Sequence, residues 1–281
     1  MCKGNDGKYF PAGQLQEYLR TEKFARQVLW RQEIDSTNNW AKEYAGSRIW
    51  MEKGTDPDGT LFVAEKQTAG KGRQGRVWTS PPGENIYMSL LLWKPEIRAL
   101  SASQLTLVMG LSVAQGMEAL TGRKAGIKWP NDVVFSGKKI CGILTEMRVQ
   151  EGKPEYIVIG AGINVNQTEF PPELQDKAAS VFLETGKKAD RTLGIARVME
   201  CFEKNYRKFL RTEDLSLLKE DYESLLLNKD RQVRIIEKKG QWQGIARGIN
   251  DQGELLVEDS YGNLKEILSG EVSVRGLYSY V

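Results

Sequence analysis

Residues 65–78 combine glycines and cations in a pattern that suits an anionic ligand, between the apolar runs 61–64 and 86–93. The glycines and cations concerned are Gly70, Lys71, Gly72, Arg73, Gly75 and Arg76. Glycine lets the backbone approach a ligand closely, the amides of such a loop form a concavity for anions, and arginine binds phosphate or carboxylate at two points. We interpret residues 65–78 as an anion-binding loop. A solvated hairpin and a nucleic-acid contact are the alternatives.

The sequence contains no histidine, and this excludes several chemistries. Neither a Ser-His-Asp or Cys-His nucleophile nor a zinc hydrolase site with histidine ligands can be built. Cys2, Cys141 and Cys201 are too widely spaced for a disulfide framework or a metal cluster. If the chain is an enzyme, we expect the substrate to supply the nucleophile and the protein to supply position and charge.

Polar side chains gather in the segment 35–39. Ser36 or Thr37 can cap a helix whose buried face begins with Trp40. Alternatively, Ser36, Thr37 and Asn38 present two hydroxyls and an amide to a polar ligand group where a helix N-terminus meets the end of a strand.

A second polar group follows the short strand that runs into Pro130. Asn131 and Asp132 stand at the end of this strand, where loops of α/β sheets carry function, although Asn-Asp after proline also makes ordinary turns. Lys139 begins the next strand. It either faces solvent or points into a ligand cleft.

Two glycines interrupt the apolar strand at residues 156–166. Gly160 and Gly162 indicate a close approach by a ligand or another strand, and a β-bulge would explain them equally well.

The remaining pattern predicts helices and a β-rich end. Apolar stripes predict helices near residues 14–28, 103–120, 193–210 and 215–227. From Arg231 onward, short strands alternate with glycine-containing turns, which predicts a small β-barrel. We therefore place a domain boundary near Asn228, with a large domain at 1–228, which would be the catalytic one if the chain is an enzyme, and a small domain at 229–281.

Composition is that of an ordinary globular protein, with 281 residues, 40% hydrophobic and 27% charged. The net charge of +3 is too mild to indicate DNA wrapping or a polybasic membrane anchor. No apolar run approaches the roughly 20 residues of a membrane helix. The N-terminus lacks the apolar core of a secretory signal. We expect a cytoplasmic protein with neither DNA nor membrane as a partner.

In their order along the chain, these motifs resemble those of the biotin protein ligases. The matching segments are 35–38, 70–78, 128–132, 139–144 and 160–164, within a resemblance that runs from about residue 34 to residue 275. The resemblance implies an α+β fold, with a mixed central β-sheet flanked by helices and a small C-terminal SH3-like β-barrel. It also implies a monofunctional ligase, because the first 33 residues are too few for the N-terminal DNA-binding domain of the repressor branch.

The resemblance implies a reaction in two steps. The biotin carboxylate attacks the α-phosphorus of ATP to give biotinyl-5′-AMP, and a lysine of a biotin carboxyl carrier protein then takes the biotin. ATP and biotin are thus the expected substrates, with Mg²⁺ as cofactor. The expected partner is the carrier domain of a carboxylase, and pairing of strand edges into a homodimer is compatible with the fold.

By position, the resemblance also assigns roles to individual residues. The biotin-binding set is Ser36, Thr37, Asn38, Gln67, Lys71, Gly72, Arg73, Lys139, Gly142, Gly160 and Gly162. The ATP-binding set is Arg76, Trp78, Asn164 and Arg275. The catalytic set is Lys71, Arg73, Asp132 and Lys139, in which Asp132 either binds Mg²⁺ or orients Lys139.

The sequence departs from the family pattern at two loop positions. Lys71 and Gln74 stand where the best-known bacterial members have arginine. Lysine keeps the charge but lacks the planar fork of arginine, which places retention of the intermediate in question.

Two other functions compete with this interpretation. The nearest is a lipoate- or octanoate-transferring enzyme, which shares the fold and, loosely, the segment 128–132. The basic glycine loop and the SH3-like tail favour biotin. From a different class, a nucleic-acid-binding module would use the loop and the barrel, but the mild net charge argues against it.

Overall fold

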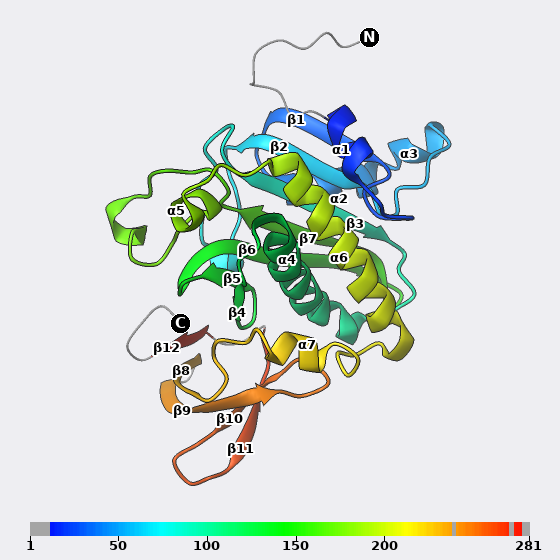
Figure 1. Ribbon diagram of the computed structural model, residues 1–281. Coiled ribbons are helices and arrows are strands. Elements are labelled where there is room, and N and C mark those ends of the chain that lie inside the picture. The colour runs from blue at the N-terminus through cyan, green and yellow to red at the C-terminus, as the bar shows by residue number, and fades with distance from the viewer. Residues whose placement is uncertain (1–11, 238–239, 270–272, 277–281) are drawn as a thin grey trace.

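The computed structural model describes residues 12–237, 240–269 and 273–276 (Figure 1). A large central β-sheet with its helices is followed by a smaller C-terminal sheet. The α-helices are α1 (Ala12–Tyr18), α2 (Thr37–Ser47), α3 (Ile49–Glu52), α4 (Leu105–Thr121), α5 (Val181–Thr185), α6 (Arg191–Thr212) and α7 (Lys219–Glu223). The 3-10 helices are η1 (Arg73–Gly75), η2 (Ala99–Gln104) and η3 (Pro172–Leu174).

The central sheet has seven strands in the order β1-β2-β3-β7-β6-β5-β4. The β1–β2 pair is parallel and the other neighbouring pairs are antiparallel, so the sheet is mixed. Its middle strands are almost continuously apolar because both faces are covered. The strands are β1 (Val28–Ile34), β2 (Leu61–Gln67), β3 (Ile86–Trp93), β4 (Gly126–Lys128), β5 (Asp132–Phe135), β6 (Lys138–Gln150) and β7 (Lys153–Ile163).

Helices cover both faces of the central sheet. In Figure 1, α4 and α6 cross the front of the sheet, and α2 packs on β2, β3 and β7 from the other side. Gly116 lets α4 and α6 come close together, since a Cβ there would lie 2.9 Å from the backbone of Val198. On the α2 face, Trp40 and Tyr44 pack edge-on against Phe62 of β2. These layers hold the strand ends that line the site.

The C-terminal sheet has five antiparallel strands in the order β11-β10-β9-β8-β12. Its strands are β8 (Arg231–Glu237), β9 (Gly240–Ile249), β10 (Leu255–Glu258), β11 (Leu264–Ile267) and β12 (Ser273–Gly276). Trp129, which is fully buried, joins this sheet to the larger one. Its indole Nε1 donates to the Gly253 carbonyl at 2.9 Å, and its backbone N donates to Asn228 Oδ1 at 2.8 Å.

The predicted α+β class, with a mixed sheet, flanking helices and a small β-rich C-terminal unit, is confirmed. The domain boundary near Asn228 stays a prediction.

Two predicted helices are much shorter than their apolar patterns suggested. The helix expected at 14–28 ends at Tyr18, and Glu203 of α6 then accepts the backbone N–H groups of residues 22, 23 and 24. The helix expected at 215–227 is limited to α7. The backbone around Leu226 is instead drawn alongside Ile127 of β4 by two hydrogen bonds. In both cases tertiary contacts override local helix propensity.

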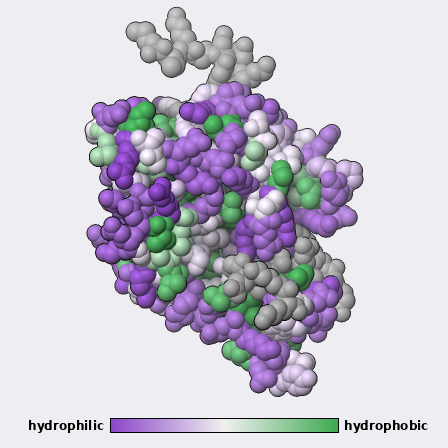
Figure 2. Space-filling model, turned by 180° about the vertical axis from the view of Figure 1, so that it is seen from behind, coloured by the Kyte–Doolittle hydropathy of each residue, from purple (hydrophilic) through white to green (hydrophobic). Residues whose placement is uncertain are grey.

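The face opposite to that of Figure 1 is mostly hydrophilic, with hydrophobic residues in small groups (Figure 2). None of the described helices is both long enough and apolar enough to span a membrane.

Candidate functional site

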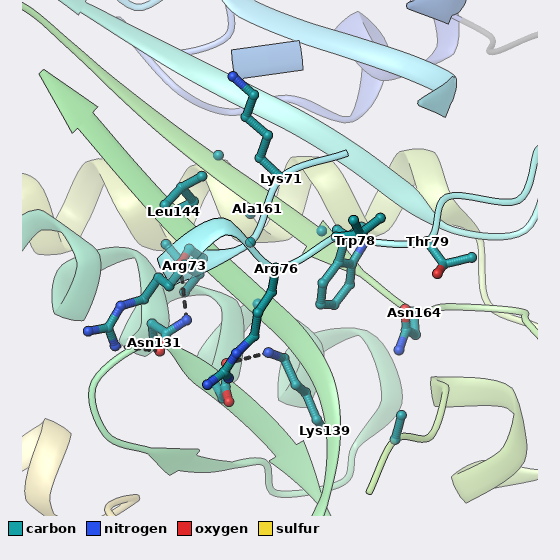
Figure 3. Close-up of a pocket in the computed structure, with 18 of the residues that line it drawn as sticks. Lys71, Arg73, Arg76, Trp78, Thr79, Asn131, Lys139, Leu144, Ala161 and Asn164 are labelled. Atoms are coloured by element: carbon teal, nitrogen blue, oxygen red, sulfur yellow. Dashed lines mark hydrogen bonds and ion pairs between the residues drawn. The ribbon is translucent and has the colours of Figure 1, made fainter. Parts of the chain in front are cut away.

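A pocket of about 400 Å³ opens where α2, the loop 65–78 and the β4–β7 strands meet. The loop and the sheet enclose it in the close-up of Figure 3. It brings together nearly all the residues that the sequence nominated. These are Ser36, Thr37, Asn38, Gln67, Lys71, Gly72, Arg73, Arg76, Trp78, Asp132, Lys139, Gly142, Gly160, Gly162 and Asn164. Arg275 is the exception: its backbone pairs with Arg234 in the C-terminal sheet, and its side chain lies outside the described part of the chain.

One end of the pocket is a buried network of hydroxyl and amide groups. Gln67 Oε1 accepts from the backbone N and the Oγ1 of Thr37, at 2.9 and 3.2 Å. Ser89 Oγ lies 2.8 Å from Thr37 Oγ1 and 2.6 Å from Asn38 Oδ1. Ser36 occupies the N-cap position of α2, yet its hydroxyl makes no capping hydrogen bond. The capping interpretation of this segment therefore accounts for the position of Ser36 but not for its hydroxyl.

The orientation of the Asn38 amide is fixed from behind by acceptors. Its Nδ2 donates to the Leu144 carbonyl at 3.2 Å and to Glu146 Oε2 at 2.8 Å. Lys42 in turn pairs with Glu146 at 2.6 Å. Burial alone would raise the pKa of Glu146, but the bonds from Lys42 and Asn38 outweigh it and leave that pKa below its ordinary value. Asn38 Oδ1 is thereby directed at β7.

Gly160 and Gly162 are explained by close approach rather than by a bulge. Both pair in unbroken antiparallel register with β3 and β6. A Cβ at Gly160 would lie 2.1 Å from Asn38 Oδ1, and one at Gly162 would lie 2.5 Å from Trp78 Nε1. Any side chain at either position would collide with a neighbouring side chain that lines the pocket.

The loop 65–78 begins as a narrow hairpin. The backbone N of Trp78 donates to the Gly70 carbonyl at 2.8 Å, and that of Gly72 donates to the Arg76 carbonyl at 2.7 Å. A Cβ at Gly70 would lie 2.4 Å from the Trp78 carbonyl oxygen, so the neck requires glycine. At the tip, Gln74 adopts φ 56°, a left-handed conformation that few non-glycine residues take.

Lys139, near the start of β6, lines the pocket. Its ammonium pairs with Asp132 Oδ1 at 2.6 Å and lies 5.2 Å from the centre of the Trp78 ring. Gly142 gives it room, because a Cβ there would lie 3.1 Å from Lys139 Nζ. Of the two interpretations left open by the sequence, the one that points Lys139 into the cleft is correct.

Arg73 reaches from the loop across to two other elements. Its Nη1 donates to Asn131 Oδ1 at 3.0 Å, and its Nη2 donates to the carbonyl of Ser269 in the C-terminal sheet region. Burial lowers the pKa of Arg73, with a partly compensating rise from Asp132. Figure 3 shows Arg76 and Lys139 reaching the same part of the pocket, whereas Lys71 extends away from both.

The sequence did not nominate every residue of this site. Ser89, Glu146 and Lys42 support Asn38, and only Ser89 carried a usable signal, as a hydroxyl within the apolar run 86–93. A further wall of the pocket comes from a segment that carries no motif, which contributes Gln167, Phe170, Pro171, Leu174, Lys177 and Ala178.

Comparison with known proteins first defines the class. Residues 31–164 match the Biotin/lipoate A/B protein ligase family, and residues 230–275 match the Biotin protein ligase C terminal domain.

Individual relatives narrow the class further. The chain is 41% identical to a bifunctional ligase/repressor of Bacillus spizizenii, covering 91% of this chain and 76% of that protein. It is 32% identical to the biotin–[acetyl-CoA-carboxylase] ligase of Mycobacterium tuberculosis, covering 86% of this chain and 89% of the relative. The structure of the Aquifex aeolicus biotin protein ligase in complex with biotin and ATP superposes with a TM-score of 0.76 at 35% identity, covering 89% and 99% of the two chains. The chain belongs to the biotin protein ligase family and is a ligase enzyme.

Proposed function

We propose that this enzyme activates biotin with ATP to biotinyl-5′-AMP and transfers the biotin to a lysine of a biotin carboxyl carrier protein. One observation carries the proposal: a single pocket joins a buried end of hydroxyl and amide groups to a cationic end under a glycine loop. This is the arrangement that a polar ring system linked to a reacting carboxylate requires. The membership of the family supports the same reaction.

The first step needs charge and position rather than a general base. A carboxylate is ionised at neutral pH, since its ordinary pKa is about 4, so it is already a nucleophile. Its approach to ATP is opposed by repulsion between anions. Arg73, Arg76 and Lys139 offset that repulsion as charge develops at the α-phosphorus. The bond from the carboxylate oxygen to phosphorus forms, and the bond to pyrophosphate breaks.

The buried end suits the ureido ring of biotin, which offers two N–H donors and one carbonyl acceptor. Ser36 provides a hydroxyl with no capping bond, and Thr37, Asn38 and Gln67 surround it with oriented amide and hydroxyl groups. Glycine backbone lines the slot between this ring and the carboxylate. We assign that role to Gly72 of the loop and to Gly142, Gly160 and Gly162 of the sheet.

We assign the nucleotide to the side of the pocket that the loop neck and the ends of the strands enclose. Trp78 supplies an aromatic face there, and Asn164, held by a bond from its Nδ2 to the Ala179 carbonyl at 3.0 Å, stands on the far side. Arg76 faces the phosphates. Arg275 completes this set as a prediction from the sequence.

Mg²⁺ enters the same proposal with Asp132 as its protein ligand. Among the described residues, no group of three or more carboxylates, cysteines or histidines is placed to hold a metal. A Mg²⁺ ion commonly binds through one or two carboxylates together with substrate phosphates, so the single carboxylate of Asp132 fits an ion that arrives with ATP. Mg²⁺ would neutralise phosphate charge. Asp132 also holds Lys139 in place.

The second step is attack by a neutral lysine amine of the carrier protein on the mixed anhydride. The carbon–nitrogen bond forms, AMP leaves, and the amine loses a proton. Until the carrier arrives, the loop must keep water from the anhydride, which is the usual role of such a lid. We propose a carboxylase carrier domain as the partner and the cytoplasm as the location.

We further propose that two copies pair through β6. Its residues 138–142 pair with β5, but from residue 144 to residue 150 one edge has no strand beside it in the described part of the chain. Met147 and Val149 on this stretch are each 45% exposed. An open edge of this kind is a template for strand addition. Sedimentation of the wild type and of Val149→Pro tests this, and an unchanged monomer in both samples would rule it out.

The decisive test of function is biotin-dependent exchange of pyrophosphate into ATP, with lipoate and octanoate in parallel. We expect exchange with biotin alone, in the presence of Mg²⁺. Exchange with lipoate or octanoate instead would keep the fold and change the substrate. No exchange with any acid would refute the ligase proposal, and binding to any duplex with a steep salt dependence would then favour a nucleic-acid module.

A further inference from the structure

Lys71 is set apart from the other cations of the pocket by its direction. Figure 3 shows it extending away from Arg73, Arg76 and Lys139. Its Nζ donates to Asn39 Oδ1, on the first turn of α2, at 2.7 Å. A cation that contacted the reacting anions would be expected to point with Arg76 and Lys139. Lys71 instead joins the neck of the loop to a helix.

The acceptor of this bond is itself held in one orientation. Asn39 Nδ2 donates to Asp35 Oδ2 at 2.5 Å, which leaves the amide oxygen of Asn39 to face the loop. Asp35 Oδ1 also accepts from the backbone N of Ser36, so the carboxylate is fixed at the start of α2. The three residues Asp35, Asn39 and Lys71 therefore form an ordered chain of side chains, which we call the α2 latch.

The charge around the latch favours a cation at position 71. Glu146 lies close enough that the charge of Lys71 contributes to lowering the pKa of the Glu146 carboxyl. Asp35 adds a second carboxylate behind Asn39. An ammonium group at the end of a flexible stem can reach the Asn39 oxygen without the planar fork that arginine would bring.

The latch lies beside the backbone bonds that shape the loop. Lys71 is between Gly70 and Gly72, whose backbone groups pair with Trp78 and Arg76 across the neck. Fixing the side chain of Lys71 on α2 therefore fixes both sides of the neck relative to the buried end of the pocket. Arg73 holds the tip through Asn131 by a separate contact.

We propose that Lys71 is a positioning residue that holds the loop over the pocket through Asn39, and that its ammonium does not contact the biotin carboxylate or the phosphates. The inference rests on the proposed function, because it assigns the retention of the adenylate partly to a contact within the protein. The positioning role explains why residue 71 is a lysine, whereas a contact with an anion would favour arginine at that position.

The first experiment needs no ligand and no activity. Hydrogen–deuterium exchange of the Gly72 and Trp78 amides is measured in the full chain for the wild type, Lys71→Met, Asn39→Ala and the double variant. Lys66→Met is the matched control, because it removes one exposed lysine from the adjacent strand, where Lys66 pairs with Glu33. We expect exchange about three- to tenfold faster in both single variants, the loss associated with one charged hydrogen bond near solvent. The control should match the wild type.

The double variant distinguishes a shared contact from two separate effects. If Lys71 and Asn39 act through one bond, exchange in the double variant is no faster than in either single variant. Effects that multiply, or loop amides that exchange at the wild-type rate in the single variants, would overturn the latch.

The second experiment measures release of biotinyl-5′-AMP from loaded enzyme. We expect release about three- to tenfold faster in both Lys71→Met and Asn39→Ala, and a rate of adenylate formation in Asn39→Ala within about twofold of the wild type. A fall in adenylate formation in Lys71→Met that Asn39→Ala does not share would show that Lys71 acts on the ligand, and would overturn the proposal. Failure of the wild type to form any adenylate would refute the proposed function at the loading step, whereas the exchange experiment would still decide the latch.

Discussion

The two ends of the pocket are built in opposite ways. The buried end draws its groups from α2, β2, β3 and β6, and Ser36, Thr37 and Asn38 are only 2–4% exposed. The loop end lies largely in solvent, with Val77 80% exposed, and few side-chain contacts beyond its own hairpin hold it. The buried end thus belongs to the packed core, while three of the cations of the other end, Lys71, Arg73 and Arg76, belong to a largely exposed loop.

The largest expected effect follows from removing the Lys139 ammonium from the cationic end of the pocket. Lys139→Ala should lower the rate of adenylate formation about 100- to 1,000-fold, because it removes a fixed cation from a site of developing charge. Lys138→Ala is the matched control, since that neighbouring lysine donates to the Gln175 carbonyl near the surface. Pyrophosphate exchange measures both. A loss under tenfold in Lys139→Ala, or an equal loss in the control, would contradict the central role of Lys139.

The next largest effect follows from a substitution that disturbs only the buried end of the pocket. Gly160→Ala places a Cβ where Asn38 Oδ1 now stands, and the added volume should weaken biotin binding about 10- to 100-fold, equivalent to ~1–3 kcal/mol of overpacking. The affinity for ATP should change little. Gly46→Ala on α2 is the control, because a Cβ there meets nothing within 4 Å. Titration calorimetry with each ligand separates the two ends, and equal losses for biotin and ATP would show that they are not independent.

The same contrast explains what the sequence could predict. The glycines, cations and strand-end polar residues can be recognised in the sequence by their type and spacing, and the fold brings those residues into one pocket. The contacts through which Glu146 and Lys42 hold Asn38 could not be inferred from the sequence. They join α2 to β6, and Lys42 and Glu146 are 104 residues apart along the chain.

The segment around Phe170 and Leu174 was missed because it has no pattern, only proximity. The helix predicted at 215–227 failed for a related reason, since pairing with Ile127 outweighs its helical periodicity. Local sequence thus predicted which residues line the pocket better than it predicted the residues that hold them in place.

A smaller effect separates retention from catalysis at the loop. Arg73→Ala should speed release of biotinyl-5′-AMP about tenfold, because it removes the contacts of the tip with Asn131 and with the carbonyl of Ser269. Increased acylation of lysines on bystander proteins should follow. Arg211→Ala, at the exposed end of α6, is a control of equal charge. Unchanged retention in a release assay would count against the lid role of Arg73.

The smallest effect is a pH dependence that belongs to the buried end. The pKa of Glu146 lies below its ordinary value of 4.5, so the folded site favours the ionised form. Its support of Asn38 is therefore complete above pH 4.5 and is lost as the pH falls through the lowered pKa.

The measurement uses biotin amide, which has no ionisable carboxylate, and verifies by near-ultraviolet circular dichroism that the protein stays folded. Affinity should be flat from pH 8 to pH 5 and then fall about three- to tenfold, the loss associated with weakening one charged hydrogen bond. Glu146→Gln should bind more weakly at pH 7 and show a flatter profile at low pH. If wild type and variant fall together, another group controls the pH dependence, and the fixed orientation of Asn38 does not depend on the Glu146 charge.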